Sequence, residues 1–257
     1  MTRKNSRTCG FIAVYLVFSL VFAASSLSLY ALAVGMTSNT SCATDKATAS
    51  STDASSSIGC LMIDAGHGGE DGGAVGVNGA AEKEINLAVA EDIAALSLLF
   101  GVPYSMTRVD DSLLYDKYDN LESYDGRKKS LDLKNRLRCA EEENALLFLS
   151  IHMNKFTSPA YSGLQVYYSP NTEDGRVLAE AIQTFTRAHL QRDNERQPKA
   201  ATSSIYLLHR LKMPAVLVEC GFLSNPTECA LLSDDAYRAS LSCTVFVPVL
   251  EYFVRQS

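Results

Sequence analysis

The sequence has too little positive charge for a nucleic-acid-binding protein. Its 257 residues carry 23 Lys and Arg against 29 Asp and Glu, a formal net charge of −6, whereas phosphate binding needs a basic surface. We find no internal repeat. With 47% hydrophobic and 20% charged residues, the composition excludes global disorder. The length suits one domain with an appendage.

Several familiar motifs are also missing. The chain has no H-E-x-x-H and no G-x-S-x-G, the signatures of one zinc-peptidase class and of many serine hydrolases. The glycine-rich segment 66–69 lacks the lysine of a phosphate-binding loop. The seven cysteines form no C-x-x-C pair and no zinc-finger spacing. We interpret the six after Cys9 as plain buried thiols, with structural disulfides as the alternative in an exported domain.

The amino-terminal segment has a composition unlike the rest. Residues 1–10 are basic, and residues 11–35 form a run of 25 residues without a charge. About 20 apolar residues span a bilayer as a helix, and positive residues mark its cytoplasmic side. We therefore expect a cytoplasmic tail and a transmembrane anchor. A cleaved signal peptide ending near Ala31-Leu32-Ala33 is the alternative. In either case the rest of the chain is exported.

Residues 36–58 are predicted to be a linker. Twelve of the 21 residues from 37 to 57 are Ser or Thr, without apolar periodicity. Such a segment cannot bury enough surface to offset its ordering entropy. Apolar residues return abruptly after it, so we expect a folded domain over residues 59–255.

The domain alternates between short apolar runs and longer segments with helical periodicity. Strands are expected at 60–65, 102–106, 145–151, 163–168 and 215–218, and helices at 81–100, 130–143, 174–190 and 237–253. Strands separated by helices predict an α/β layered domain with a largely parallel sheet.

Three predicted strands end in residues that carry chemistry. The run CLMIDA is followed by His67 in a glycine-rich turn, ALLFLSI by His152, and AVLV by Glu219. Sites in such sheets form outside the carboxyl ends of the strands. The sequence therefore predicts that two histidines and a carboxylate meet at one edge.

Together with Glu82, at the start of the helix predicted over 81–100, these residues suggest a catalytic zinc site. Two histidines and a carboxylate with one open position form the ligand set of such a zinc, and a separate carboxylate must then transfer the proton. His67, His152 and Glu82 are the candidate ligands, and Glu219 is the candidate for proton transfer. The alternatives are a chance His67 in a turn, a structural His152, and a Glu82 that only favours a helix start. Glu219 directly follows four apolar residues, where a carboxylate is costly unless paired or functional.

Four sequence blocks resemble those of a known family. They are IDAGHGGEDGGAVG (63–76), EKEINLA (82–88), LFLSIHMN (147–154) and VECGFLSNPTE (218–228). They are similar to the signature blocks of the zinc-dependent N-acetylmuramoyl-L-alanine amidases, and the similarity extends from residue 60 to about residue 253. The resemblance implies a zinc amidase catalytic domain over residues 59–255, with a mixed, mainly parallel sheet flanked by helices.

The resemblance also assigns roles. It implies that zinc is held by His67, Glu82 (rather than Glu84) and His152, and that Glu219 is the catalytic acid/base. The implied reaction is hydrolysis of the amide between the lactyl group of N-acetylmuramic acid and L-alanine of the peptidoglycan stem peptide.

Three further residues are candidates for substrate binding. Asn154 lies at the same strand end as His152. Arg108 and Arg136 are candidates for holding stem-peptide carboxylates, a task suited to a planar guanidinium group. Surface ion pairs are the alternative for both arginines.

Finer features resemble the membrane-anchored sporulation amidases of endospore formers, which act on spore-cortex glycan in the muramic-δ-lactam pathway. They include the segments RKKSLDLKNRL (127–137) and SGLQVYYSP (162–170). Peptidoglycan, the membrane and an activator protein are the expected partners. A vegetative cell-separation amidase, a zinc peptidase that cuts the stem peptide, and an inactive wall-binding module are the competing interpretations. The acidic stretch 110–127 fits a solvated loop, a lid or a partner-binding loop.

The anchor interpretation is testable by fractionation. If residues 11–35 are an uncleaved anchor, the full-length protein stays in the membrane fraction with its domain outside, because a run of this length spans a bilayer. Protease accessibility and amino-terminal sequencing measure this. A mature protein that starts near Val34 and is found in the soluble extract would contradict it.

Overall fold

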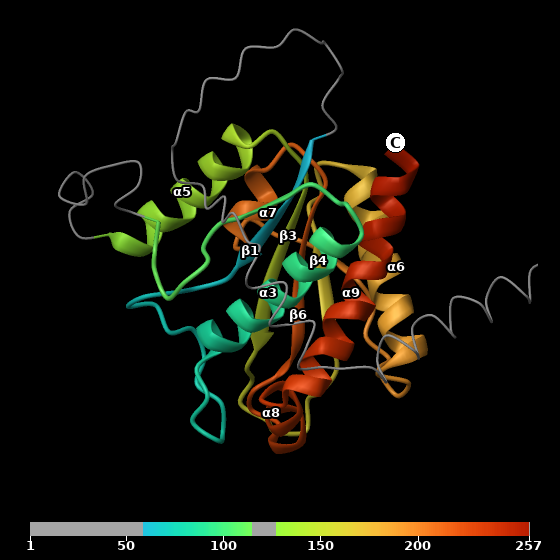
Figure 1. The fold of residues 1–257 in the computed structure, drawn as a ribbon. Helices are drawn as coiled ribbons and strands as arrows, with labels where there is room; N and C mark the ends of the chain where they lie inside the picture. Colours follow the sequence, from blue (N-terminus) through green and yellow to red (C-terminus); the bar gives the residue numbers. More distant parts are fainter. Residues whose placement is uncertain (1–58, 115–126, 257) are drawn as a thin grey trace, which may run out of the picture. The chain divides into compact units, whose positions relative to one another are not determined.

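A six-stranded β-sheet in the order β2-β1-β3-β6-β4-β5 forms the centre of the domain (Figure 1). The computed structural model describes residues 59–114 and 127–256. Neighbouring strands are parallel except for the antiparallel pair β4–β6, which confirms the mixed, mainly parallel sheet. The strands are β1 (Cys60–Ala65), β2 (Tyr104–Met106), β3 (Ala145–Asn154), β4 (Gln165–Tyr168), β5 (Lys199–Ala200) and β6 (Ala215–Phe222).

Helices cover both faces of the sheet, because successive strand residues point to opposite sides. Ile63 and Val218 face the larger core, which is covered by α3 (Glu82–Leu99), α6 (Glu173–His189) and α9 (Asp235–Gln256). Met62 and Leu217, one residue away in each strand, face the smaller core, which is covered by α5 (Lys128–Glu142) and α7 (Tyr206–Arg210). The short helix α8 (Pro226–Leu232) follows β6.

The two central strands are longer than their apolar runs. β3 continues past Ile151 to Asn154, and β6 continues past Val218 to Phe222. The ladder between them persists, with His152 paired to Glu219 in the register. The two candidate residues therefore lie within strands rather than after them. The elements β5, α7 and α8 were not predicted, because two, five and seven residues are too few for a periodic pattern.

The expected amino-terminal segments 1–10, 11–35 and 36–58 lie outside the described residues. Within the described ranges, none of the helices is both long and apolar enough to cross a membrane. The cysteines found there are free thiols, as expected: Cys60, Cys139, Cys220, Cys229 and Cys243.

A buried ion network joins β1 to α5. The side chain of Arg136 is 2% exposed, and its nitrogens lie 2.6 Å from Asp64 Oδ1 and 2.7 Å from Asp132 Oδ2. Burial would raise the pKa of Asp64, but Arg136 and the Ser150 hydroxyl hold it below its usual value. The attraction offsets the desolvation of these charges only while every partner is present.

Replacing Arg136 with Met tests this network. The substitution leaves Asp64 and Asp132 buried without their partner, so we expect the free energy of unfolding to fall by about 3–5 kcal/mol. Urea titration followed by circular dichroism measures the change. Arg138→Met on the same helix is the control, since Arg138 is 52% exposed in its pair with Glu142 and should change stability by less than about 0.5 kcal/mol. Equal stabilities of the two variants would contradict the prediction.

Candidate metal centre and active site

The turn after β1 carries His67 in an unusual backbone conformation. His67 has a φ of 62°, in the left-handed region, which is uncommon for a residue with a side chain. The preceding Gly66 leaves room for the site, because a Cβ at this position would lie 2.3 Å from the His152 ring. The glycine therefore allows the two histidines to approach each other, with ring centroids 4.9 Å apart.

Two buried arginines hold this turn from below. Arg136 donates to the carbonyl oxygens of Ala65 and His67, at 2.8 and 2.6 Å. Arg108 donates to the carbonyl oxygens of Ala65 and Gly66, at 2.8 and 3.0 Å. Each of the three carbonyl groups thus accepts from a guanidinium, and the backbone of His67 is fixed.

This arrangement corrects the interpretation of Arg108 and Arg136. Both were expected to bind stem-peptide carboxylates or to form surface ion pairs. Their side chains are instead buried beneath the turn, with 4% and 2% of each residue exposed, and their nitrogens bind backbone and carboxylate oxygens of the protein itself. Sequence alone does not separate a buried arginine from an exposed one.

The three candidate ligands come together at the carboxyl edge of the sheet. Atoms of His67, Glu82 and His152 lie within 4.8 Å of one another, a geometry that fits one metal ion. Oε1 of Glu82 is 3.2 Å from His67 Nε2 and 3.1 Å from His152 Nδ1. Glu82 opens α3, so that the helix start and the ends of β1 and β3 converge here.

Glu82 is held as a carboxylate. Its Oε1 accepts from Met153 N at 3.0 Å and its Oε2 from Ala74 N at 2.7 Å. Burial would raise the pKa of Glu82, but hydrogen bonds with His152 and His67 lower it far below its usual value. The donor set of two imidazoles and one fixed, ionised carboxylate therefore fits a catalytic zinc.

Asp71 lies within ion-pair distance of one of the histidines, although the two do not form an aligned hydrogen bond. Its Oδ2 lies 3.0 Å from His67 Nδ1 and 3.2 Å from Lys129 Nζ, which leaves His67 Nε2 facing Glu82. Such a carboxylate partner commonly fixes the tautomer of a ligating histidine. Asp71 was not among the predicted site residues. Its only sequence signal is its place in the glycine-rich turn, four residues after His67.

Glu219 lies next to His152 on the neighbouring strand, and the charges of the three candidate ligands act on it. In the β3–β6 register it pairs with His152, and its Oε2 is buried without a hydrogen-bond partner among the described residues. Burial raises the pKa of Glu219 to about 7, with the two histidines opposing and the Glu82 charge adding to the rise. An unpartnered carboxylate whose pKa lies near 7 suits proton transfer at neutral pH.

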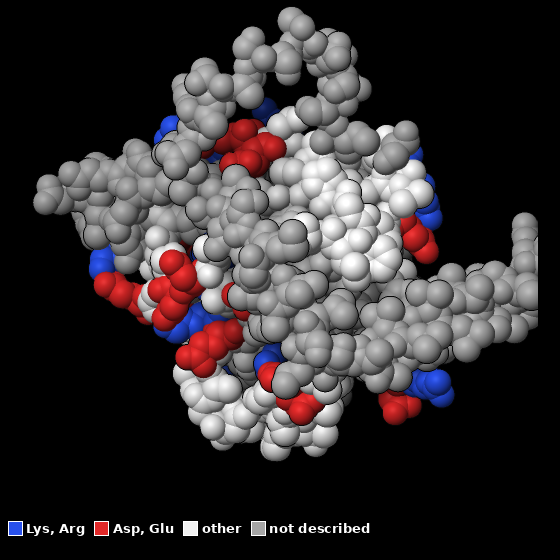
Figure 2. Space-filling view, in the orientation of Figure 1, with Lys and Arg blue, Asp and Glu red and all other residues white. Residues whose placement is uncertain are grey.

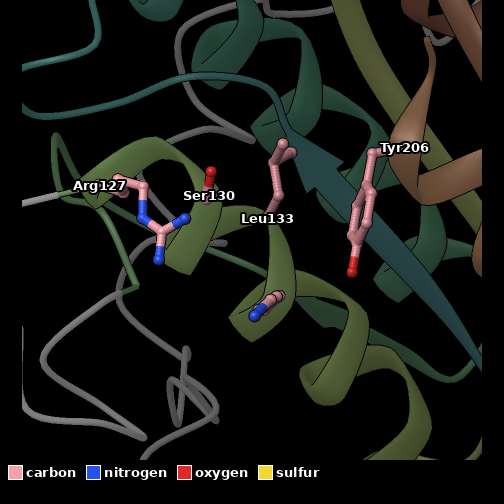
Figure 3. Close-up of a pocket in the computed structure, with 5 residues that line it drawn as sticks. Arg127, Ser130, Leu133 and Tyr206 are labelled. Atoms are coloured by element: carbon pink, nitrogen blue, oxygen red, sulfur yellow. The ribbon is translucent and has the colours of Figure 1, made fainter. Parts of the chain in front are cut away.

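Asn154, a pocket between two helices and the surface charges are further candidate places for ligand binding. Asn154 is half-buried at the end of β3. A pocket of about 230 Å³ is lined by residues of α5 and α7, with Leu133 between Ser130 and Tyr206 in the view of Figure 3. His67, Glu82, His152 and Glu219 do not line this pocket. On the face drawn in Figure 2, the described Lys and Arg side chains are interspersed with Asp and Glu.

Residues 61–246 match the protein family described as N-acetylmuramoyl-L-alanine amidase. The chain belongs to this family. The amidase is 33% identical over 196 residues to the germination-specific N-acetylmuramoyl-L-alanine amidase of Bacillus subtilis, a match covering 76% of this chain and 80% of the relative.

Solved structures agree. The CwlD amidase from Clostridioides difficile, determined in complex with the GerS lipoprotein, is 34% identical with a TM-score of 0.70, covering 77% of this chain and 99% of that chain. The catalytic domain of CwlV, an N-acetylmuramoyl-L-alanine amidase from Bacillus (Paenibacillus) polymyxa, is 27% identical with a TM-score of 0.62, covering 76% and 98%. The family, the fold and the enzyme class expected from the four sequence blocks are confirmed: the protein hydrolyses the amide between N-acetylmuramic acid and L-alanine in peptidoglycan.

The raised pKa of Glu219 predicts a pH-dependent effect of Glu219→Gln on metal-free protein. Folding favours protonated Glu219, because its pKa is about 7 in the folded state against an ordinary 4.5. That stability is complete below pH 4.5 and is lost as the pH rises to 7. We expect equal stabilities near pH 4.5, and above pH 7 a gain for the variant on the order of 2–3 kcal/mol.

Urea titrations at pH 4.5 and pH 8 with a chelator present measure this difference. Glu251→Gln is the control, since Glu251 is 60% exposed in its pair with Arg255 and its effect should be nearly the same at both pH values. A Glu219→Gln effect of equal size at both pH values would refute the assigned burial cost.

Proposed function

We propose that the amidase is a zinc enzyme in which His67, Glu82 and His152 hold the metal and Glu219 is the catalytic acid/base. The observation that carries the proposal is the contrast between two buried carboxylates a short distance apart. Glu82 is hydrogen-bonded and held ionised, with a lowered pKa, whereas Glu219 has an unpartnered oxygen and a pKa raised to about 7. Carboxylates whose environments separate their pKa values in this way divide the roles of ligand and proton carrier.

The chain's own residues carry the proton transfer. Zinc, when bound, supplies Lewis acidity to the amide carbonyl and to the attacking water. Oε2 of Glu219 accepts the proton that the water loses and delivers it to the nitrogen of the departing L-alanine. Asp71, with Oδ2 3.0 Å from His67 Nδ1, favours one tautomer of this imidazole, and the two buried arginines fix the backbone of the turn that carries it. Asn154, half-buried beside His152, binds the substrate near the scissile bond.

A spore-cortex role is proposed for this amidase, in the pathway that forms muramic-δ-lactam. The germination-specific relative and CwlD, at 33% and 34% identity, support this role over vegetative cell separation. The complex of CwlD with a lipoprotein supports an activator protein as partner. We place the domain outside the cytoplasm, where peptidoglycan lies, anchored by residues 11–35 and joined to them by the linker 36–58.

Product analysis separates the amidase from a zinc peptidase that uses the same residues. Mass spectrometry of digested peptidoglycan should reveal free muramic acid and intact stem peptides that begin with L-alanine. Products cut within the stem peptide would indicate the peptidase. An inactive wall-binding module would bind peptidoglycan and release nothing.

Two substitutions distinguish metal binding from proton transfer. His67→Ala removes a neutral imidazole ligand, so zinc affinity and activity should both fall, and excess zinc should partly restore activity. Glu219→Ala should keep near-stoichiometric zinc and the fold, while hydrolysis falls by about 10²–10⁴, the usual contribution of a general acid/base. Metal analysis beside a peptidoglycan assay measures both effects.

The opposite pattern would show that the roles are misassigned. It would consist of a Glu219→Ala variant that loses zinc but keeps turnover, or of a His67→Ala variant that keeps both. Thermal unfolding of each variant checks the fold, and Glu219→Ala should be at least as stable as the unmodified protein because it removes a buried, unpaired carboxylate.

A further inference from the structure

We propose that Arg196 binds a carboxylate of the stem peptide and so makes the amidase prefer stem peptides that carry a free acid at that position. The proposal rests on the proposed function, since it names the substrate group that the same site recognises. It also assigns to a different residue the task for which Arg108 and Arg136 are buried too deeply.

Arg196 is held in one position by its surroundings. Its Nε donates to the carbonyl oxygen of Ser162 at 2.8 Å, and its Cζ lies 4.5 Å from the ring centroid of Phe222. The backbone is fixed as well: Arg196 N donates to Asn194 Oδ1 at 2.9 Å, and Arg196 O accepts from Arg187 Nη2 at 2.6 Å. A stacked guanidinium fixed in this way loses little further freedom when it binds an acid.

The terminal nitrogens of Arg196 have no acidic partner within the described parts of the chain. The hydrogen bond from Nε to Ser162 is the contact its guanidinium makes there, besides its stacking on aromatic rings. Glu228 feels the Arg196 charge, but its oxygens accept from Gly163 N and Phe222 N, each at 2.8 Å. In a chain with an excess of acidic residues, this arginine keeps its two terminal NH₂ groups for a ligand.

Arg196 also lies at the active-site edge of the sheet. Phe222, on which it stacks, is the last residue of β6, three residues after Glu219. The next residue along the chain, Gln197, accepts a hydrogen bond from Gln165, and Gln165 is the partner of Glu219 in the β4–β6 register. Burial raises the pKa of Tyr167, with Glu219 adding to the rise and Arg196 opposing it, so both charges act on one hydroxyl group.

The negative charges of the substrate lie on the stem-peptide side of the scissile amide. The glycan consists of neutral N-acetylated sugars, and the muramic acid carboxyl is consumed in the scissile amide. Carboxylates occur along the stem peptide that leaves with L-alanine. An unpaired guanidinium at the same edge of the sheet as Glu219, the proposed proton donor to the leaving amine, therefore has the stem peptide as its chemical match, and a planar carboxylate fits its two terminal nitrogens.

The test compares substrates that differ in one group. Short synthetic glycans carry L-Ala-D-Glu on muramic acid, with the glutamate α-carboxyl free or amidated and the γ-carboxyl free or amidated, four substrates in all. Zinc-loaded full-length protein should cleave the acid form faster at one of the two positions. Arg196→Gln should lower kcat/KM for that acid form by about 10- to 100-fold, mainly through KM, which is the loss expected for a hydrogen bond between charged groups. It should leave the matching amide form nearly unchanged.

Matched variants complete the test. Arg196→Lys should retain part of the preference, because it keeps the charge without the planar fork. Arg192→Gln makes the same charge change on the same loop at an exposed residue and should keep the full preference. Arg196→Gln lowering both acid and amide forms equally, or no preference in the unmodified protein, would overturn the role of Arg196 while leaving the proposed function standing. Failure of the unmodified protein to release L-Ala-D-Glu from any substrate would instead overturn the proposed function.

Discussion

The clamp of two buried guanidinium groups on the turn after β1 is the interaction on which the site depends. Arg108 and Arg136 occupy the carbonyl oxygens of three successive residues, and this holds His67 at a φ of 62°. Buried arginines destabilise a fold unless their charges are met, and Asp64 and Asp132 meet that of Arg136. The two buried guanidinium groups thus fix the backbone that carries the His67 imidazole. A metal site requires side chains that are held this precisely.

Two glutamates at the same edge of the sheet have the same side chain but opposite environments. Glu82 receives backbone N–H groups and two imidazoles, which stabilise its charge. Glu219 receives no hydrogen bond at Oε2 from the described residues, and the Glu82 charge raises its pKa further. A metal ligand must remain ionised and a proton carrier must change its protonation state. The proposed roles of the two glutamates therefore rest on their hydrogen-bond donors and burial and not on residue type.

The sequence predicted the layered fold and the meeting of His67, His152 and Glu219, because parallel strands bring their carboxyl ends to one edge and apolar runs mark the strands. It placed these strand ends too early at Ile151 and Val218, since polar side chains inside a ladder leave no hydrophobic signal. The choice of Glu82 over Glu84 came from family resemblance, because both lie in the first turn of α3. Arg136 was misread for a physical reason: its partners are up to 72 residues away, and only the folded chain shows whether an arginine faces inward.

The candidate residues follow one another in a fixed order across the sheet. Across the sheet from β1 to β3, β6 and β4, the proposed metal ligands His67 and His152 come first. Glu219 follows on β6, and the loop bearing Arg196 lies beyond it, next to β4. In an amide hydrolase the carbonyl must lie at the Lewis acid and the leaving nitrogen at the proton carrier. A substrate placed in this way has its glycan on the β1 side and its stem peptide extending toward β4. We infer that the neutral half of the substrate lies near the turn that bears His67, and that the acidic half extends toward the guanidinium of Arg196, which has no acidic partner among the described residues.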